Sequence, residues 1–521
     1  MDILETIIRE LINDAGKSGA DLSMVKRRVA KKYKAPCPTN ISLLRTYHKL
    51  VENKTLQASP LVKNLLITRP VRSLSGIVNI SVLTKPYPCP GKCIYCPSQK
   101  GSPKSYLNNE PAVMRAILNK YDPYDQVKMR LRALEMTGHP TDKIELRIIG
   151  GTWSFYPKNY QTWFVKRCFD ACNARGRSDI SKAQKCNETA RHRIVGLSIE
   201  TRPDFITEKE IQRLRELGAT MAELGVQSIY DDALKLIKRG HGRNETIRAT
   251  KLLKDAGFKV CYQMMPNLPG ANTLRDKKMF RELFSNGDFQ PDMLKIYPCA
   301  LLKEAPLYRW WKNKKYKPYT KHQLIALVKA IKKSVPPYVR IQRITRDIPS
   351  QSIIAGPAKL SNLRQMITGH CKCIRCREVK GDYNAKEKLF LFRRDYQASG
   401  GKEIFLTFEN KNQSKLYSLL RLRVCVENGS RPFAMIREVH TFGQSLEVRP
   451  LKARLPAEGR TSPASPQHKG LGKKLLQEAE KISLLSGVNK IEIISGVGVR
   501  GYYRKLGYKL EKTYMTKFLS A

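Results

Sequence analysis

The stretch that decides the fold is Cys89-Pro-Gly-Lys-Cys93-Ile-Tyr-Cys96, which sets its cysteines in a CxxxCxxC pattern. Three thiolates from one loop can hold three irons of a cubane iron–sulfur cluster and leave the fourth iron open. An open iron can bind a small molecule and pass it an electron, and S-adenosylmethionine (SAM) is the natural occupant for radical chemistry. A zinc loop is the alternative, but structural zinc prefers four ligands and the next cysteine is Cys168. The pattern favours a 4Fe-4S cluster.

Outward from the triad, residues 76 to about 350 alternate short apolar runs with helical patterns. We expect strands at 76–83, 144–149, 194–199, 221–226, 258–265 and 293–298, and helices that include 123–136, 207–217, 244–256 and 274–284. This alternation predicts parallel strands with crossover helices, and therefore a full or partial α/β barrel. The cysteine loop follows the first strand, at the end where such barrels place their chemistry.

Polar and glycine-rich segments follow several of these strands and would complete a SAM pocket. Gly150, Gly151 and Thr152 follow the second strand, where glycines let the backbone approach a ligand closely. Glu200 closes the third strand and Gln227 ends the fourth, so each can offer a polar group to the ligand. Such turns are common individually, and their shared position at strand ends after the triad carries the prediction.

Residues 403–521 have a different pattern, with strands at 404–408, 417–424 and 433–441, a polar loop at 455–466, and a helix from Gly470. A strand at 490–495, a short helix near 500–505 and a final strand complete a separate α+β domain. Gln467-His-Lys-Gly-Leu-Gly472 opens the helix, where backbone N–H groups can cradle a pyrophosphate and Lys473 adds charge. This loop resembles the coenzyme A loop of GCN5-related N-acetyltransferases; a simple glycine-rich helix cap is the alternative.

A third cysteine group, Cys371, Cys373 and Cys376, has CxCxxC spacing and lies between the two large domains. The spacing favours a structural zinc site, which needs a fourth ligand. His370 and Cys299 are both candidates, and the sequence does not decide between them. Unligated buried thiols are the alternative.

The net charge is +51, from 96 Lys and Arg against 45 Asp and Glu, and the basic residues are spread along the whole chain. A large polyanion is the partner that this charge favours, with nucleic acid first and no preference between DNA and RNA. The pattern of residues 1–75 predicts three short helices, with a basic face at 23–33. The arrangement is similar to a helix-turn-helix, and Asn40 is the expected N-cap of the third helix. A solvated helix face is the alternative.

The chain has no apolar run of about 18 residues, so no membrane-spanning helix is expected. Its 13 cysteines are odd in number and no secretory signal precedes them. We therefore interpret them as thiols and metal ligands in the reducing cytoplasm.

Several motifs together are similar to the family of the Elongator catalytic subunit: CPGKCIYCP, IIGGTW, GLSIETRPD, ELGVQSIYDD, KRGHG, MMPNLPG, QHKGLGKKLLQEAE and ISGVGVRGYYRKLGY. The short spacing between the first two cluster cysteines resembles archaeal members. The resemblance implies a partial radical SAM (β/α) barrel joined to an α+β GCN5-related N-acetyltransferase domain. We expect a basic helical tRNA-binding segment at 1–75, the radical SAM domain at 76–360, a cysteine-rich linker at 361–390 and the acetyltransferase domain at 391–521.

The same resemblance implies a tRNA-modifying enzyme that acts at the wobble uridine, position 34 of the anticodon. It would use SAM radical chemistry and acetyl-CoA to form 5-carboxymethyluridine. The implied cofactors and co-substrates are a 4Fe-4S cluster, SAM and acetyl-CoA, with zinc in the linker. The implied partners are the tRNA anticodon stem-loop and an electron donor, without accessory subunits or a membrane. A protein lysine acetyltransferase and an RNA-binding scaffold with a structural metal are the alternatives.

Site residues carry over from the family where this sequence matches its motifs. Cys89, Cys93 and Cys96 match the cluster ligands, and Lys143 matches a barrel lysine that reaches acetyl-CoA. Glu438, Val439, His440 and Thr441 match the family's strand along the pantetheine arm of the coenzyme. Leu471, Gly472 and Lys473 match its pyrophosphate loop. Tyr503 matches a tyrosine near the thioester, where a phenol can hydrogen-bond the acetyl group, and its neighbour Tyr502 is a second candidate. Core packing is the alternative for both tyrosines.

Overall fold

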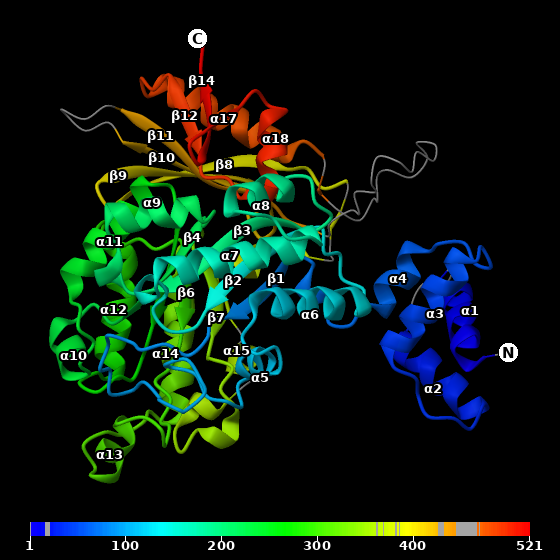
Figure 1. Ribbon diagram of the computed structural model, residues 1–521, viewed down its shortest axis with the longest axis horizontal. Coiled ribbons are helices and arrows are strands. Elements are labelled where there is room, and N and C mark those ends of the chain that lie inside the picture. The colour runs from blue at the N-terminus through cyan, green and yellow to red at the C-terminus, as the bar shows by residue number, and fades with distance from the viewer. Residues whose placement is uncertain are drawn as a thin grey trace.

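The structure is a computed structural model with two seven-stranded sheets and a separate group of amino-terminal helices (Figure 1). It describes residues 2–15, 21–360, 363–367, 369–380, 383–384, 386–425, 432–443, 466–467 and 469–520. The polar loop expected at 455–466 lies almost entirely outside the described residues, and so does His468.

The first sheet, here the barrel sheet, is wholly parallel and follows chain order from β1 to β7. Its strands are β1 (Val78–Leu83), β2 (Lys143–Ile149), β3 (Arg193–Thr201), β4 (Met221–Gln227), β5 (Lys259–Met264), β6 (Met293–Ile296) and β7 (Arg340–Ile344). Because β1 and β7 do not pair with each other, the barrel is partial, as predicted. The sequence predicted the first six strands and missed β7.

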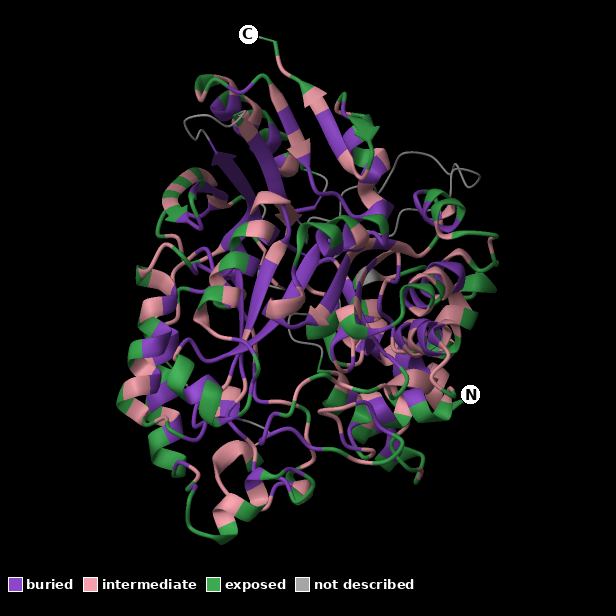
Figure 2. Ribbon diagram, turned by 60° about the vertical axis from the view of Figure 1, so that its left-hand side comes forward, coloured by how far each residue is buried: buried purple, intermediate pink, exposed green. Residues whose placement is uncertain are grey.

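Helices cover the convex side of the barrel sheet and leave its concave side open. They include α6 (Pro123–Met136), α7 (Lys158–Asn173), α9 (Glu208–Glu216), α11 (Arg243–Asp255), α12 (Thr273–Ser285) and α14 (Lys321–Ser334). Along β2, Ile144, Leu146 and Ile148 are fully buried, whereas the residues between them are half-buried. This alternation follows from the two-residue period of a strand that packs on helices through one face. The buried strands form the centre of the molecule (Figure 2).

The second sheet, here the mixed sheet, has the order β13-β14-β12-β11-β10-β9-β8. Its strands are β8 (Phe390–Ala398), β9 (Gly401–Glu409), β10 (Leu416–Cys425), β11 (Phe433–Thr441), β12 (Lys490–Ile493), β13 (Lys509–Glu511) and β14 (Tyr514–Phe518). Helix α17 (Leu471–Leu485) packs on its central strands, and α18 (Arg500–Arg504) follows β12. The predicted α+β arrangement is confirmed, and β8 and β13 are additions to it.

The mixed sheet lies at the amino ends of the barrel strands. Arg437 on β11 donates to the carbonyl of Phe258, just before β5, and Arg421 on β10 donates to the carbonyl of Tyr338, just before β7. The loop at Gly496 approaches β3 so closely that a Cβ atom there would clash with the backbone of Val195. The carboxyl ends of the barrel strands, where the cysteine loop begins, therefore remain free of the mixed sheet.

The amino-terminal helices form their own small core. They are α1 (Ile3–Ala15), α2 (Leu22–Lys32), α3 (Asn40–Glu52) and α4 (Pro60–Leu66), of which the sequence predicted the first three. The N-cap of α3 is Thr39 and not Asn40, because the Thr39 side chain accepts the N–H of Ser42. The unit contacts the carboxyl end of α6, where His139 bonds both Ser73 and the carbonyl of Thr68.

Candidate functional site

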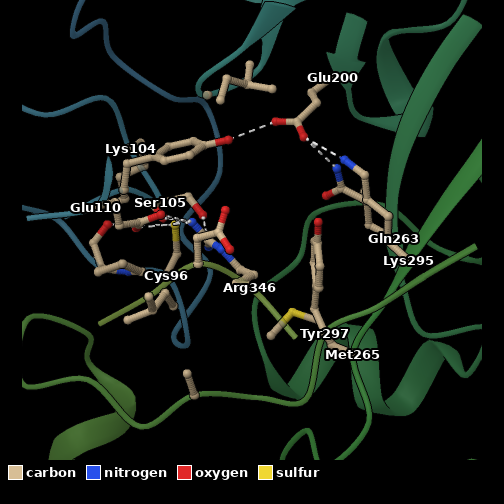
Figure 3. A pocket seen from close by; sticks show the side chains of 18 of the residues that line it. Cys96, Lys104, Ser105, Glu110, Glu200, Gln263, Met265, Lys295, Tyr297 and Arg346 are labelled. Carbon is tan, nitrogen blue, oxygen red and sulfur yellow. Dashed lines mark hydrogen bonds and ion pairs between the residues drawn. The ribbon is translucent and has the colours of Figure 1, made fainter. Parts of the chain in front are cut away.

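A cavity of about 270 Å³ opens at the carboxyl ends of the barrel strands. Its wall includes Cys89 and Cys96 of the cysteine loop, Glu200 at the end of β3 and Gln227 at the end of β4. Figure 3 shows Glu200, Lys295, Tyr297 and Arg346 arranged around this space. The strand ends at which the sequence predicted a SAM site therefore surround a cavity.

The three cysteines of the triad lie in one loop at the cavity, with Cys93 and Cys96 buried and Cys89 half-buried. The Gly91 N–H donates to Cys89 Sγ at 3.4 Å, and Arg239 donates to Cys93 Sγ at 3.5 Å. Burial, together with Cys93, raises the pKa of the Cys96 thiol to about 11. Thiolates in this position need a compensating positive charge, which bound iron supplies.

Four of the five residues predicted for SAM line the cavity: Gly151, Thr152, Glu200 and Gln227. Thr152 Oγ1 lies 3.8 Å from Cys89 Sγ, so this turn meets the cysteine loop directly. Gly150 does not line the cavity. It has φ +118°, and a side chain there would clash with Thr84, so this glycine shapes the turn and does not touch the hollow.

A chain of charged side chains runs from the cavity wall to Glu223, which is buried behind it. Glu200 accepts from Tyr106 at 3.0 Å and from Lys295 at 3.1 Å. Lys295 also pairs with Glu223, which accepts from Arg147 at 2.9 Å. Burial alone would raise the pKa of Glu223, but Lys295 and Arg147 outweigh it and lower that pKa to about 2. Glu223 is therefore ionised at neutral pH, and its ion pairs hold Lys295 and Arg147 in place.

Lys295 and Glu223 were not predicted from the sequence. Both lie inside fully buried strands, and a charged residue in an otherwise apolar strand is the signal that could have indicated them. Arg346 donates to Ser105 and pairs with Glu110, which joins the segment after β7 to the segment after the cysteine loop. No local pattern marked that long-range contact.

The second part of the site is the amino end of α17 in the mixed sheet. Gly470 has φ +80°, a left-handed conformation that favours glycine, and the backbone turns there into the helix. Leu471 is buried and Lys473 is exposed beyond it. A Cβ atom at Gly472 would lie 3.2 Å from the hydroxyl of Tyr502. The first N–H groups of a helix have no intrahelical partner, which is why the sequence predicted an anion cradle at this turn.

The two predicted tyrosines have different surroundings. Tyr502 is 42% exposed, and its hydroxyl lies near Gly472. Tyr503 is 6% exposed and packs in the core of the mixed sheet against Tyr508, with 6.1 Å between ring centroids. Tyr502 is thus the one whose phenol lies beside the glycine turn.

The predicted pantetheine strand has a free edge. β11 and β12 pair only from Ala434 to Ile436, and β11 then continues to Thr441. No described strand pairs with Glu438–Thr441 on that side, where an extended ligand can add to the edge. The Thr441 carbonyl is already engaged, because it accepts from the Gln467 side chain at 3.1 Å. The Glu438 side chain points elsewhere: it accepts from Arg421 at 2.8 Å and from Lys259 of the barrel at 3.3 Å.

A hydrogen bond connects the glycine loop to β2, whose other end borders the cavity. Lys143, at the amino end of β2, donates to the Gln467 side chain of the glycine loop at 2.9 Å. Burial lowers the pKa of Lys143, with Asp142 opposing and Arg193 adding to the shift. Lys143, Glu145 and Arg147 alternate with the buried residues of β2, and Arg147 lines the cavity. At about 3.3 Å per residue, roughly 20 Å of strand separates the glycine loop from the cysteine loop.

The linker cysteines form the tightest group of metal-ligating atoms among the described residues. The sulfur atoms of Cys371, Cys373 and Cys376 all lie within 4.8 Å of one another, beside α16 (Ile374–Arg377). The Ile374 N–H bonds the carbonyl of Val339, at the amino end of β7. Cys299 follows β6 and packs with Cys93 at the opposite end of the barrel sheet, so it cannot be their fourth ligand.

Comparison with known proteins places the chain in a class. The model of the Radical SAM superfamily matches residues 87–282, and the model of the Radical_SAM C-terminal domain matches residues 291–372. With the partial parallel barrel and the cysteine loop, these matches define a radical SAM protein, and such a domain implies a 4Fe-4S cluster and SAM. The three thiols and the adjoining cavity fit both groups. Among the described residues, no helix has the length and apolarity to cross a bilayer.

Full-length relatives identify the family. The chain is 43% identical to the tRNA uridine(34) acetyltransferase of Methanocaldococcus infernus, over 99% of this chain and 98% of the relative. It is 37% identical to Elongator complex protein 3 of Schizosaccharomyces pombe, over 98% and 97%. The solved archaeal M. infernus Elp3 with an N-terminal deletion (1–46) is 41% identical, has a TM-score of 0.71, and covers 86% of this chain and 100% of its own. The chain belongs to the family of tRNA uridine(34) acetyltransferases and Elongator complex protein 3, as its motifs predicted.

Proposed function

We propose that this protein converts the wobble uridine of tRNA to 5-carboxymethyluridine with SAM and acetyl-CoA. The observation that carries the proposal is the contact between Lys143 of the barrel and Gln467 of the glycine loop, because it joins the two ligand sites through one strand. Both sites border the concave side of the barrel sheet, at opposite ends of β2. The acetyl group must therefore travel along this side to meet a uridine in the cavity.

The chemistry requires a radical because C5 of uracil is not acidic or basic enough for ordinary acetyl transfer. SAM at a reduced cluster supplies a radical that can take hydrogen from an unactivated carbon. The chain's own residues position and shield the reactants. Cys89, Cys93 and Cys96 would hold the cluster, and Glu200, fixed by Tyr106 and Lys295, would orient SAM.

At the other end of β2, we assign acetyl-CoA to the glycine turn and the free edge of β11. The backbone of Leu471, Gly472 and Lys473 would bind the pyrophosphate, and Glu438–Thr441 would pair with the pantetheine amides. Lys143 can donate a hydrogen bond to a carbonyl or phosphate oxygen of the coenzyme. Tyr502 is the better placed of the two tyrosines to donate to the acetyl group, because Tyr503 is buried in the core.

Mass spectrometry of tRNA tests this function. The purified chain, alone, is incubated anaerobically with tRNA, a reductant, SAM and acetyl-CoA, and 5-carboxymethyluridine is expected at position 34. Cys93→Ser should abolish the product, whereas Cys37→Ser, at an exposed cysteine of the amino-terminal unit, should not. Absence of the product with wild-type protein, together with acetylation of a basic peptide, would instead favour a protein lysine acetyltransferase.

We also propose a structural zinc ion at Cys371, Cys373 and Cys376, which supply three of the four ligands that such a site needs. His370 is adjacent in sequence and is the remaining candidate for the fourth ligand. Elemental analysis should find one zinc per chain in addition to cluster iron. Cys376→Ser should remove the zinc and leave the iron content unchanged; equal loss of both metals would contradict two independent sites.

A further inference from the structure

A run of aromatic rings lies beside the cysteine loop, outside the cavity. Ring centroids are 4.8 Å apart for Tyr87 and Tyr156 and 5.2 Å for Tyr156 and Tyr160, both in stacked geometry. The run extends to Trp163 at 5.6 Å on one side. On the other side it reaches Phe155 at 6.0 Å from Tyr87 and Phe205 at a further 6.1 Å. We call this set the aromatic platform: Tyr87, Phe155, Tyr156, Tyr160, Trp163 and Phe205.

The platform divides into a buried base and exposed ends. Tyr156 is buried, and Trp163 and Phe155 are 43% and 39% exposed. Trp153 and Phe164, which contact Tyr156 and Tyr160 in tilted geometry, are almost wholly buried. The surface of the platform consists of exposed Phe155 and Trp163 at its ends and of half-buried Tyr87, Tyr160 and Phe205. Aromatic rings grouped in this way at a surface mark a binding site.

Its position ties the platform to the cavity. Tyr87 precedes Cys89 by two residues, and Phe155 follows Thr152, which lines the cavity. Ser154, which precedes Phe155 in the sequence, is hydrogen-bonded at 2.8 Å to Thr201 at the carboxyl end of β3. The platform therefore adjoins the segments of Cys89 and Thr152, which line the cavity.

Positive charge accompanies these rings. The Nζ atom of Lys85 lies 4.9 Å from the centroid of the Tyr160 ring, and Lys85 is exposed. Lys209 is exposed beside Phe205 in a shallow cleft. Neither lysine forms an ion pair among the residues that the structure describes. Lys158 of the same cleft is already paired with Glu210. Aromatic rings interleaved with free cations are the pattern of surfaces that bind single-stranded nucleic acid.

We propose that the aromatic platform stacks unpaired RNA bases that adjoin the nucleotide held in the cavity. The inference rests on the proposed tRNA substrate and extends it: the substrate must present single-stranded bases, as an anticodon loop does. A uridine can enter the cavity only after it leaves its stack, and a ring surface beside the cysteine loop offers its neighbours a replacement. Lys85 and Lys209 would meet the phosphates between those bases.

Binding without SAM or acetyl-CoA tests the platform separately from turnover. The full chain is titrated with an anticodon stem-loop and with a fully paired duplex of equal length and charge. The double variant Phe155→Ala/Trp163→Ala should bind the stem-loop at least tenfold more weakly and the duplex within twofold of wild type. Trp163→Phe, which keeps a ring, should retain most of the affinity. Phe518→Ala removes an exposed ring from β14 of the mixed sheet and should change neither affinity.

Trp163 fluorescence gives a second measurement that does not depend on affinity. The stem-loop should quench wild-type emission, and Trp163→Phe should lose that quenching. Unchanged stem-loop affinity in a folded double variant would overturn the proposal and assign these rings to a protein partner. Equal loss for stem-loop and duplex would also overturn it, because it would indicate phosphate contact without base stacking. Wild-type protein that binds normally but forms no modified uridine would contradict the proposed function and leave the platform standing.

Discussion

At the scale of single residues, Arg239 is the side chain that most directly adjoins the cysteine loop. It is buried, donates to Cys93 Sγ at 3.5 Å, and donates also to the carbonyl of Gly225. Arg202 lies on the same loop, since a Cβ atom at Gly91 would meet its Nη1 atom. That nitrogen is buried and has no hydrogen-bond partner among the residues that the structure describes. Two guanidinium groups thus face the segment that would hold the cluster.

Replacing Arg239 with Gln should make the cluster harder to reduce. Reduction adds negative charge, and a buried cation near a ligand sulfur stabilises the reduced form. We expect the midpoint potential to become more negative by at least about 59 mV, which for one electron corresponds to a tenfold change in the ratio of reduced to oxidised cluster. Spectroscopic redox titration at matched iron content measures the shift, and Arg239→Lys should recover part of it. An unchanged potential in Arg239→Gln would show that the arginine only supports the loop.

The residue scale also separates what the sequence could predict from what it could not. The cysteine triad and the glycine loop are local, so their spacing alone indicated their chemistry. Lys143 could be predicted only through the family resemblance, because its partner Gln467 lies 324 residues away. The pair of Lys295 and Glu223 depends on the register of β4, β5 and β6, which no local pattern contains.

At the scale of elements, the start of α17 is the piece on which the acetyl-CoA assignment depends. Gly472 faces Tyr502, Thr441 and Val439, each within 4 Å of where a Cβ atom would lie. Gly472→Glu should weaken acetyl-CoA binding at least tenfold, about 1.4 kcal/mol, because it places a carboxylate on the pyrophosphate path. Calorimetric titration measures the loss. Gly176→Glu is the matched control and should bind normally, because no atom of the described residues lies within 4 Å of a Cβ atom at that position. Normal affinity of Gly472→Glu for acetyl-CoA would show that this loop does not bind the pyrophosphate.

Helix α2 is the element with the clearest free positive charge. Arg27, Lys31 and Lys32 are exposed and form no ion pair within the described part of the chain, whereas Arg28 is held by Glu10 and Asp14. Changing these three residues to Ala should weaken tRNA binding and reduce the slope of log affinity against log salt by about 2 to 3. The control variant changes Lys505, Lys509 and Lys512, which lie between α18 and β14, to Ala, and should leave the slope unchanged. If both triple variants changed the slope equally, α2 would contribute only through the net charge of the protein and would not be a specific tRNA-binding surface.

Element prediction succeeded where apolar runs were continuous and failed where they were short or mixed. The first six barrel strands carry recurring apolar residues, at alternate positions in β2 and in a longer run in β4, which marked them in the sequence. β7 is only Arg-Ile-Gln-Arg-Ile, and β8 alternates half-buried with exposed residues at the edge of its sheet. Such strands are specified by the neighbour they pair with, so the sequence alone gave no clear signal.

At the scale of the whole molecule, a buried ionic network joins the two sheets. Asp292, before β6, accepts from Arg437 of β11, which also contacts Glu403 of β9. Arg423 pairs with Asp255 at the end of α11, and Lys254 lies among the same acids. The charges compensate one another only while the barrel and mixed sheets are in contact. The network therefore fixes the relative position of the cavity and the glycine loop, which any transfer between them requires.

Glu438 provides the test of this coupling through its pH dependence. Burial would raise the pKa of this carboxyl, but Lys259 of the barrel and Arg421 outweigh it and lower the pKa to about 2. An acid with a depressed pKa adds stability that is complete above its unfolded value near 4.5 and disappears as the pH falls towards 2. Glu438→Gln should therefore lower the free energy of unfolding by about 3 kcal/mol at pH 7.

The stability gap between wild type and Glu438→Gln should close progressively as the pH falls from about 4.5 to about 2. Urea denaturation at a series of pH values measures it, and Glu492→Gln, at a half-exposed glutamate of β12, should show no comparable gap. Because Lys259 belongs to the barrel and Glu438 to the mixed sheet, the variant should also separate the unfolding of the two sheets. A gap that persisted unchanged at pH 2 would mean that packing of the side chain, and not its charge, holds the sheets together.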